Sequence, residues 1–293
     1  MVNELTALST ELADVVGKVG KSVVAVDARP RFGSSGVFWR PGIVVTAEHT
    51  IRREEEIQVA LPDGATVPAA VAGTDPGTDL AVLKVDGHAG DAPVLAAGDP
   101  VPGNLALSIG RSPDSGVNAT MGIVSAVSGS WRTWRGGRLD RYIRLDLTLY
   151  PASSGGLVVN TKGEAIGIAT SALSRIAGLA IPSSTVDRVV EEILSRGHVA
   201  RGYLGVGLQP VELPDHHKGL IVLSLEPDGP AAKAGVLIGD VMVSLGGTAV
   251  SDTDDIQSVL ERHAVGQTIA AGLVRGGAAL SIGVAIGERS RRN

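Results

Sequence analysis

The stretch that decides the fold is YIRLDLTLYPASSGGLVVNTKGEAIGIA, residues 142–169. Apolar and polar side chains alternate from residue 142 to residue 150, which predicts a half-buried β-strand. A second apolar run begins at Leu157, and Pro151 with the glycine pair before Leu157 predicts a tight turn between two strands. The turn therefore presents the hydroxyl of Ser154 at the end of a rigid sheet.

A serine in such a turn has two interpretations. Serine is a weak nucleophile, and it reacts when a base takes its proton and backbone N–H groups face the developing oxyanion. Turns rich in glycine and serine are also common where no chemistry takes place. The first interpretation requires a base and an orienting carboxylate elsewhere in the chain.

Two residues far from Ser154 have the chemistry that a serine nucleophile needs. His49 follows an apolar strand-like run, and Asp79 stands at the entrance of another, LAVLKV at residues 80–85. A carboxylate beside an apolar strand needs hydrogen-bond partners, so Asp79 is either a strand-end cap or a functional group. A lone histidine in such a place can equally be a satisfied structural residue.

The composition excludes several classes of protein. The 293 residues predict about two domains. The net charge is −5 and no long basic run occurs, which argues against nucleic acid or an anionic membrane as partner. The absence of cysteine excludes disulfides, thiol catalysis and cysteine-based metal sites.

The N-terminus carries acidic residues where an export signal would be basic, and no run reaches the roughly 18 apolar residues of a membrane span. We therefore expect a cytoplasmic protein if the chain is complete. If an export signal or an anchor has been removed, the protein is extracytoplasmic.

Hydrophobic periodicity divides the chain into two parts. Residues 4–19 predict an amphipathic helix, and residues 33–36, GSSG, predict a flexible turn. Strand-like runs then recur about every ten to fifteen residues as far as residue 181, which predicts a β-barrel or sandwich. After Pro182 a helix capped by Ser183 or Ser184 is expected to end at Gly197.

The second part begins after a short linker and is about ninety residues long. It alternates strand-like runs with a small turn at residues 229–232 and a helix that starts after Ser251 or Thr253. Closing strands follow at residues 267–286. We find no internal repeat between the two parts.

Three segments together resemble the catalytic segments of chymotrypsin-like serine proteases: TAEH at 46–49, TDLAVLK at 78–84 and SSGG at 153–156, in the order His, Asp, Ser. Over residues 8–288 the chain is more closely similar to the HtrA (Deg) group, in which a trypsin-like domain precedes one or two PDZ domains. The resemblance implies a mostly β protein, a chymotrypsin-like double β-barrel followed by a small α+β PDZ domain. The implied boundaries are an N-terminal helix at 1–20, a protease domain at 21–197, a linker at 198–201, a PDZ domain at 202–288 and a tail at 289–293.

The resemblance also assigns catalytic roles. Ser154 attacks the scissile carbonyl, His49 takes its proton, and Asp79 orients the imidazole. The backbone N–H groups of Ala152 and Ser154 form the oxyanion hole. No metal takes part.

The chain departs from the family at Ala152 and Ser153, where the family usually has glycine and asparagine. If the reactive turn needs a positive φ at residue 152, alanine costs about 1–2 kcal/mol. That cost is within the range of allosteric coupling, about 1–3 kcal/mol. We therefore expect a protease whose oxyanion hole is disordered at rest and is ordered by a ligand or by assembly.

Specificity and peptide binding are also inferred by resemblance. The primary substrate pocket is expected to be lined by Ile168, Ala169, Thr170, Ser171 and the loop to Gly178, which include no acidic residue to receive a basic side chain. The resemblance implies cleavage after small aliphatic residues. A peptide's C-terminus is expected to add as a strand beside residues 206–209. The residues expected to bind this peptide are Tyr203, Leu204, Gly205, Val206, Ile256 and Leu260. Alternatively, the second domain is a spacer or an assembly surface.

Two functions follow from this reading. The first is a serine endopeptidase that cleaves unfolded or misfolded polypeptides, with a PDZ domain that binds the C-termini of substrates or activators. The alternative is a weakly active or inactive chaperone or scaffold that acts through PDZ peptide binding. By resemblance we expect a homo-oligomer, a trimer, and a periplasmic or cell-envelope location if the protein is exported.

Overall fold

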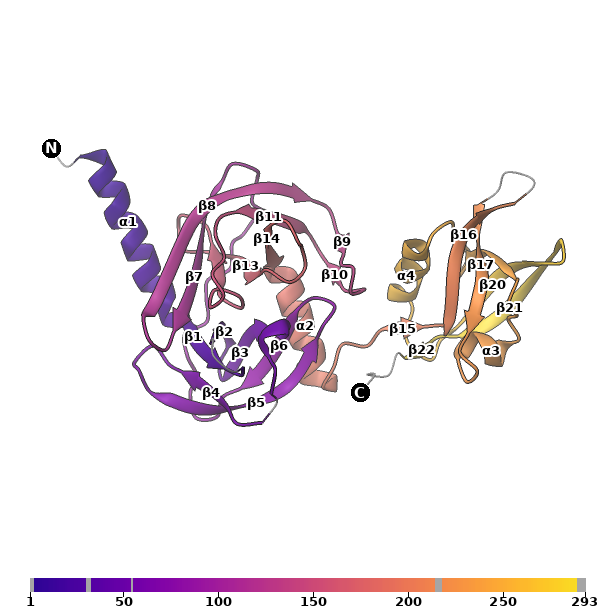
Figure 1. Ribbon diagram of the computed structural model, residues 1–293, viewed down its shortest axis with the longest axis horizontal. Helices are drawn as coiled ribbons and strands as arrows, with labels where there is room; N and C mark the ends of the chain where they lie inside the picture. Colours follow the sequence, from indigo (N-terminus) through magenta and orange to yellow (C-terminus); the bar gives the residue numbers. More distant parts are fainter. Residues whose placement is uncertain (1–2, 30–32, 54, 214–217, 289–293) are drawn as a thin grey trace. The chain divides into compact units, whose positions relative to one another are not determined.

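A computed structural model describes residues 3–288 of the chain except residues 30–32, 54 and 214–217. The chain forms two compact units, Met1–Val199 and Ala200–Asn293. The first unit consists of two closed β-barrels, and the second is a small sheet with two helices (Figure 1). The predicted fold class, a mostly β double barrel followed by a small α+β domain, is confirmed.

The first barrel closes in the order β1-β2-β3-β6-β5-β4, with every neighbouring pair antiparallel. Its strands are rich in valine, whose branched side chain suits the pleated surface of a barrel wall. Their bounds are β1 Val23–Asp27, β2 Ser34–Arg40, β3 Ile43–Ala47, β4 Ile57–Ala60, β5 Thr66–Asp75 and β6 Leu80–Lys84.

The second barrel closes in the order β11-β14-β13-β12-β7-β8. The strand predicted over residues 142–150 ends earlier, because β11 covers Tyr142–Asp146 and the chain then turns away toward Ser154. The strands are β7 Leu105–Ser112, β8 Gly116–Ser128, β11, β12 Leu157–Val159, β13 Ala165–Thr170 and β14 Gly178–Pro182, with a separate pair, β9 Trp131–Arg132 and β10 Arg138–Leu139.

The two barrels share one hydrophobic core. Leu80 of the first barrel packs in the same cluster as Ile109, Leu157 and Ile168 of the second, and all four side chains are fully buried. Burying a side chain of this size contributes about 1.5–3 kcal/mol relative to leaving it exposed. The junction between the barrels is therefore a rigid part of the unit.

The prediction of a flexible turn at residues 33–36 is wrong. Ser34 and Ser35 begin β2 and are fully buried. Their hydroxyls are satisfied by distant carbonyls, since Ser34 donates to Val26 and Ser35 donates to Ala152 at 2.6 Å. A buried hydroxyl with such a partner can stand in a core strand.

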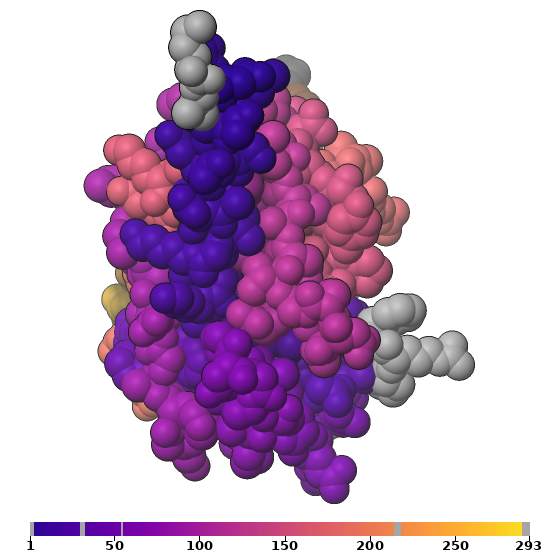
Figure 2. All heavy atoms as spheres, turned by 90° about the vertical axis from the view of Figure 1, so that its left-hand side faces the viewer, coloured from indigo at the N-terminus to yellow at the C-terminus, as the bar shows by residue number. Residues whose placement is uncertain are grey.

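Two helices flank the barrels. α1 covers Glu4–Val19 as predicted, and Figure 2 shows it in indigo along one face of the unit. Its last turns pack on the core, whereas Leu5 is 72% and Leu8 is 44% exposed. No helix in the described ranges is both long and apolar enough to cross a membrane.

α2 covers Ser183–Arg196 and ends at Gly197, whose φ of +80° makes it the predicted stop. The predicted serine cap is wrong. The residue before the helix is Pro182, and the Ser183 hydroxyl donates instead to the carbonyl of Ala165 at 3.2 Å. The helix is tied to the first barrel by the indole of Trp39, which donates to Asp187 at 2.7 Å.

The second unit is a sheet in the order β16-β17-β18-β20-β21, with β16 at one edge. α4 begins with a capping box in which Asp252, rather than Ser251 or Thr253, is the N-cap residue. Its elements are β15 Gly202–Tyr203, β16 Val206–Glu212, β17 Lys218–Leu225, α3 Pro230–Ala234, β18 Val241–Leu245, β19 Thr248–Ala249, α4 Thr253–Glu261, β20 Thr268–Arg275, β21 Ala278–Ala285 and β22 Gly287–Glu288.

An ion pair between the buried Asp240 and the partly exposed Arg275 fastens the loop before β18 to β20. The carboxylate of Asp240, 1% exposed, accepts from Arg275 at 2.7 and 2.8 Å and from the Leu237 N–H at 2.8 Å. The hydrogen bonds from Arg275 lower the pKa of Asp240 below its ordinary 3.8, against the opposing effect of burial.

Arg275→Met keeps the aliphatic stem of the side chain and leaves the buried carboxylate with one backbone donor. We expect the second unit to lose stability at neutral pH. Because the folded-state pKa of Asp240 is lowered, this stabilisation is complete above the unfolded pKa and is lost as pH falls through the folded one. Hydrogen exchange of residues 241–245 and 268–275 should therefore differ from wild type at pH 7 and approach it only as the pH falls below 3.8, through the lowered pKa of Asp240.

Arg262→Met, at the exposed end of α4, is the matched control and should change little. An Arg275→Met effect of equal size at pH 7 and pH 3 would contradict this account of Asp240.

Candidate active site

The candidate base and the candidate carboxylate lie at one edge of the first barrel. β3 and β6 are antiparallel neighbours, and Ala47 at the end of β3 pairs with Leu80 at the start of β6. His49 follows in the 3-10 turn η2, Glu48–Thr50, and Asp79 immediately precedes β6. The strand register therefore brings together two residues that are 30 positions apart.

Asp79 is fully buried and accepts hydrogen bonds from both barrels. Its carboxylate accepts from the His49 N–H at 2.9 Å, from His49 Nδ1 at 2.9 and 3.0 Å, and from the Thr170 hydroxyl at 2.5 Å. Its backbone adopts a left-handed φ of +59°, which aspartate tolerates better than most residues. These donors satisfy a charge that would otherwise be costly to bury.

The hydrogen bond to Asp79 fixes the tautomer of His49. An ionised carboxylate can only accept, so Nδ1 carries the proton and Nε2 is left as an acceptor. The His49 side chain is 18% exposed, so the imidazole is partly open to solvent. This is the state that a general base needs before it takes a proton from serine.

Ser154 lies in the turn that follows β11 and is 2% exposed. Its neighbour Gly155 has a φ of +83°, and a Cβ there would lie 2.2 Å from the Ser35 carbonyl and 2.8 Å from the Ala47 nitrogen. Only glycine permits this approach. The serine turn therefore packs against the end of β3, two residues before His49.

The Ser154 hydroxyl has a partner next to the residue that supports Asp79. Ser154 Oγ lies 3.2 Å from Ser171 Oγ, and Thr170, the preceding residue, binds Asp79. Within the described residues, no hydrogen bond joins His49 to Ser154. At rest the serine hydroxyl is thus engaged by a second serine.

Every carbonyl of the serine turn accepts a hydrogen bond. The donors to the carbonyls of residues 150–154 are, in order, Ser153 N–H, Arg29, Ser35 Oγ, Gly156 N–H and Ser35 N–H, at 2.8, 2.8, 2.6, 2.9 and 3.1 Å. By contrast, the N–H groups of Ala152 and Ser154 have no hydrogen-bond partner among the described residues. These two are the donors expected of the oxyanion hole. The expectation of an oxyanion hole that is disordered at rest stays a prediction.

A loop from the second barrel supports the edge that carries His49. Arg135 lies 3.3 Å from the Glu48 carboxylate, and the Thr133 hydroxyl donates to the Gly77 carbonyl at 2.7 Å. Burial, followed by the charge of Asp79, raises the pKa of Glu48, and Arg135 opposes this. Glu48 was not among the predicted site residues. The tryptophans and arginines of the loop at residues 128–141 were the available signal for this contact.

The predicted pocket residues occupy different positions. Ile168 is fully buried in the core shared by the barrels. The Ala169 carbonyl and N–H bond to the backbone of Gly155 and Gly156 at 2.9 and 2.8 Å. Ser171 is exposed beside Ser154, and Thr170 faces Asp79.

The predicted peptide-binding residues surround the start of β16. Tyr203 lies in β15 and its hydroxyl donates to Glu226, while Gly205 has a φ of +75°. Leu204, Ile256 and Leu260 are 3%, 4% and 3% exposed and belong to the core of the unit.

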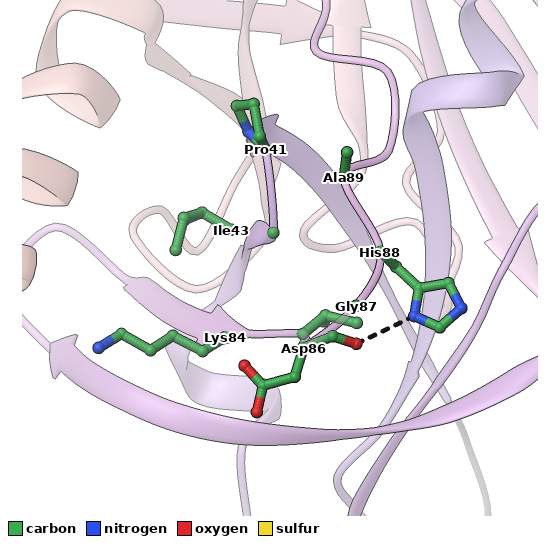
Figure 3. A pocket seen from close by; sticks show the side chains of 9 residues that line it. Pro41, Ile43, Lys84, Asp86, Gly87, His88 and Ala89 are labelled. Carbon is green, nitrogen blue, oxygen red and sulfur yellow. Dashed lines mark hydrogen bonds between the residues drawn. The ribbon is translucent and has the colours of Figure 1, made fainter.

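A shallow pocket of about 390 Å³ lies at the opposite end of β3 and β6 from His49 and Asp79 (Figure 3). The side chains of Lys84, Asp86 and His88 point in different directions there, and the His88 ring pairs with the backbone carbonyl of Asp86 at 3.0 Å. Binding sites usually have polar groups that converge. No group of three or more acidic or histidine side chains able to hold a metal ion occurs in the part of the chain that the structure describes.

Comparisons with known proteins agree with this architecture. Residues 33–168 match the family of the trypsin-like peptidase domain, and residues 202–286 match the PDZ domain. A Brucella suis protein named probable periplasmic serine endoprotease DegP-like is 36% identical over 269 residues, which cover 87% of this chain and 52% of that protein. A Halomonas elongata protein with the same name is 32% identical, with 89% and 57% covered. The chain spans about half the length of the curated relatives it matches.

Solved structures match over nearly the whole chain. The serine endoprotease from Yersinia pestis has a TM-score of 0.81 and 30% identity, and covers 95% of this chain and 98% of its own. The HtrA-type protease AlgW with a decapeptide also has a TM-score of 0.81, at 28% identity, with 96% and 99% covered. Two barrels with His, Asp and Ser at their junction and a PDZ unit define a trypsin-like serine protease class. The chain belongs to the HtrA family of these proteases, as the resemblance implied.

Thr170→Val should test how Asp79 is supported. The variant keeps the shape of the side chain but removes one donor from a buried carboxylate, so we expect kcat to fall by about 5- to 50-fold with little change in KM. Thr170→Ser retains the hydroxyl and should remain near wild type. Peptidase kinetics of both variants provide the measurement, and equal rates for them would contradict the role given to the hydroxyl.

Proposed function

We propose that the chain is a serine endopeptidase that cleaves unfolded or misfolded polypeptides through Ser154, His49 and Asp79. The observation that carries the proposal is the fully buried Asp79 carboxylate, which holds His49 by Nδ1 while Nε2 remains free to accept a proton.

The mechanism uses groups of the chain itself. Ser154 Oγ leaves Ser171 and attacks the scissile carbonyl while His49 Nε2 takes its proton, and the imidazolium is stabilised by Asp79. The N–H groups of Ala152 and Ser154 receive the oxyanion. His49 then gives the proton to the leaving amine, and water repeats the sequence on the acyl-enzyme. Neither a metal nor an organic cofactor takes part in these steps.

The proposed substrate preference is for small aliphatic residues. It rests on the segment Ile168–Ser171, in which Thr170 and Ser171 are the polar members and no acidic side chain occurs. A basic substrate side chain would lack a partner there. A preference for Lys or Arg in a peptide library would argue against this proposal.

The PDZ unit is proposed to bind peptide C-termini. Its β16 pairs with β17 on one side and forms an edge of the sheet, so a peptide strand can add on the other. The peptide's carboxylate is assigned to the loop of Leu204 and Gly205, and a side chain would rest over Ile256 and Leu260. A spacer or assembly role is the alternative for this unit.

Assembly and location are also proposals. The relatives named as periplasmic favour an extracytoplasmic location, and family membership favours a homotrimer. The exposed Leu5 and Leu8 of α1 are compatible with a contact between subunits. The unfolded polypeptides and C-terminal peptides named above are the proposed partners, and nucleic acid is not.

The serine turn favours a resting state of low activity. The bond from Ser153 N–H to the Tyr150 carbonyl closes a four-residue turn, and Ala152 at its third position does not have a positive φ. A hydrogen-bonded turn of this kind with Pro151 second is type I, because type II needs a positive φ at the third residue and hence usually glycine. We propose that the reactive turn is the type II form.

This reading leaves the second candidate function open. If the type I turn never converts, the chain is a weakly active or inactive chaperone or scaffold that acts through the PDZ unit.

Ala152→Gly should raise basal peptidase activity. Glycine removes a cost of about 1–2 kcal/mol for the positive φ, which corresponds to roughly a 5- to 30-fold rise in rate. Initial rates on a short peptide substrate provide the measurement. Ala119→Gly, at an exposed position of β8, is the control, and activity of Ala152→Gly equal to or below wild type would count against the proposed turn conversion.

Ser154→Ala tests the proposed function itself. We expect the purified chain to degrade an unfolded protein such as casein, and the variant to lose this activity, because no other group supplies the nucleophile. Ser174→Ala is the matched control. Peptides with apolar C-termini should stimulate cleavage if the PDZ unit couples to the site.

Peptide binding without cleavage by the wild-type chain under any condition would favour the scaffold function.

A further inference from the structure

Arg29 of the first barrel contacts the serine turn of the second. It follows β1, and its guanidinium Nη2 donates to the Pro151 carbonyl at 2.8 Å and to the Gly33 carbonyl at 3.1 Å. Burial and the charge of Arg52 lower its pKa, yet an arginine remains cationic at neutral pH. A cation held against a carbonyl that is 122 positions away constrains both partners.

The carbonyl that Arg29 holds belongs to the peptide whose N–H is the proposed oxyanion donor. In a trans peptide, the Pro151 C=O and the Ala152 N–H point in opposite directions, and no cis bond occurs among the described residues. The orientation of one group therefore fixes that of the other. Arg29 thus determines where the Ala152 N–H points.

The contact is specific to the resting form of the turn. Type I and type II turns differ by rotation of the central peptide, here Pro151–Ala152, through about half a circle. After that rotation Arg29 would face an N–H instead of a carbonyl. Two donors cannot bond, so the type II form loses this charge-assisted hydrogen bond.

The hydrogen bonds to other carbonyls of the turn do not distinguish the type I form from the type II form. The Ala152 carbonyl is held by Ser35 Oγ at 2.6 Å and the Ser154 carbonyl by Ser35 N–H at 3.1 Å, and both belong to peptides outside the rotating one. Arg29 is the side chain that binds the peptide that rotates.

We propose that Arg29 is a positioning residue that holds the Pro151–Ala152 peptide in its resting orientation and so lowers the basal activity of Ser154. The proposal rests on the proposed function, in which Ser154 is the nucleophile and Ala152 an oxyanion donor. Release of Arg29 from Pro151 is then a step of activation, together with the change of φ at Ala152.

The test is Arg29→Met, which keeps the stem and removes the donors. Basal peptidase activity should rise on the order of 10-fold, the loss of one charge-assisted hydrogen bond from the resting form, through kcat rather than KM. Arg29→Lys retains one cationic donor group, and its basal activity should lie between those of the wild type and Arg29→Met. Damage to the fold would lower activity, so a rise cannot come from misfolding.

Arg53→Met is the matched control, because Arg53 is an exposed arginine of the same barrel that pairs with Asp27. It should leave the rate unchanged. Activity of Arg29→Met at or below wild type, while Ser154→Ala abolishes cleavage, would overturn the proposal and leave the proposed function standing.

A crystal structure of Arg29→Met provides a readout that does not depend on activity. We expect the Pro151 carbonyl to have left its wild-type position in at least part of the molecules. A turn identical to that of the wild type would overturn the role of Arg29. If neither protein cleaves any substrate, the proposed function fails, and the position of the carbonyl still decides whether Arg29 holds the turn.

Discussion

The candidate active site depends on one buried charge, the carboxylate of Asp79. It is fully buried, and its donors come from the 3-10 turn after β3 in the first barrel and from the end of β13 in the second. Removing one partner of a buried charge typically costs about 3–5 kcal/mol, so these donors cannot be lost without a large penalty. The need to satisfy Asp79 therefore holds His49 in one tautomer and keeps the two barrels in register.

Ser35 holds the turn of the candidate nucleophile, Ser154. Its N–H donates to Ser154, its hydroxyl donates to Ala152, and its carbonyl accepts from Thr46 at 2.6 Å. The serine turn belongs to the second barrel by sequence, yet it is held by the first. The contacts that hold Asp79 and those that hold the serine turn thus both cross the junction between the barrels. Arg29 adds a further contact, to the Pro151–Ala152 peptide.

Patterns within a few residues predicted much of the fold. The apolar spacing predicted α1, and Gly197 ends α2 through its left-handed φ. His49 and Asp79 were recognised as candidates because polar side chains at the ends of apolar strands need hydrogen-bond partners. The serine cap of α2 was wrong because Ser183 has a better acceptor in Ala165 on β13. A local pattern does not reveal such a competitor.

The remaining site residues could not be predicted because their partners are far away in the sequence. Ser35 reads as part of a flexible turn until Ala152, 117 positions later, is seen to accept its hydroxyl. Arg29 and Pro151 are likewise joined only by the closure of the barrels. The resemblance to a family predicted His49, Asp79 and Ser154, and the three-dimensional contacts show the groups that hold these residues.

The most direct test of the account is covalent labelling by a serine-directed fluorophosphonate, followed by intact-mass and peptide analysis. A nucleophile activated by His49 and Asp79 predicts one adduct per chain on Ser154, at a rate that His49→Ala abolishes. An unlabelled chain, or an adduct that persists in His49→Ala, would contradict the central claim. That claim is that the buried Asp79 orients His49 so that it can activate Ser154.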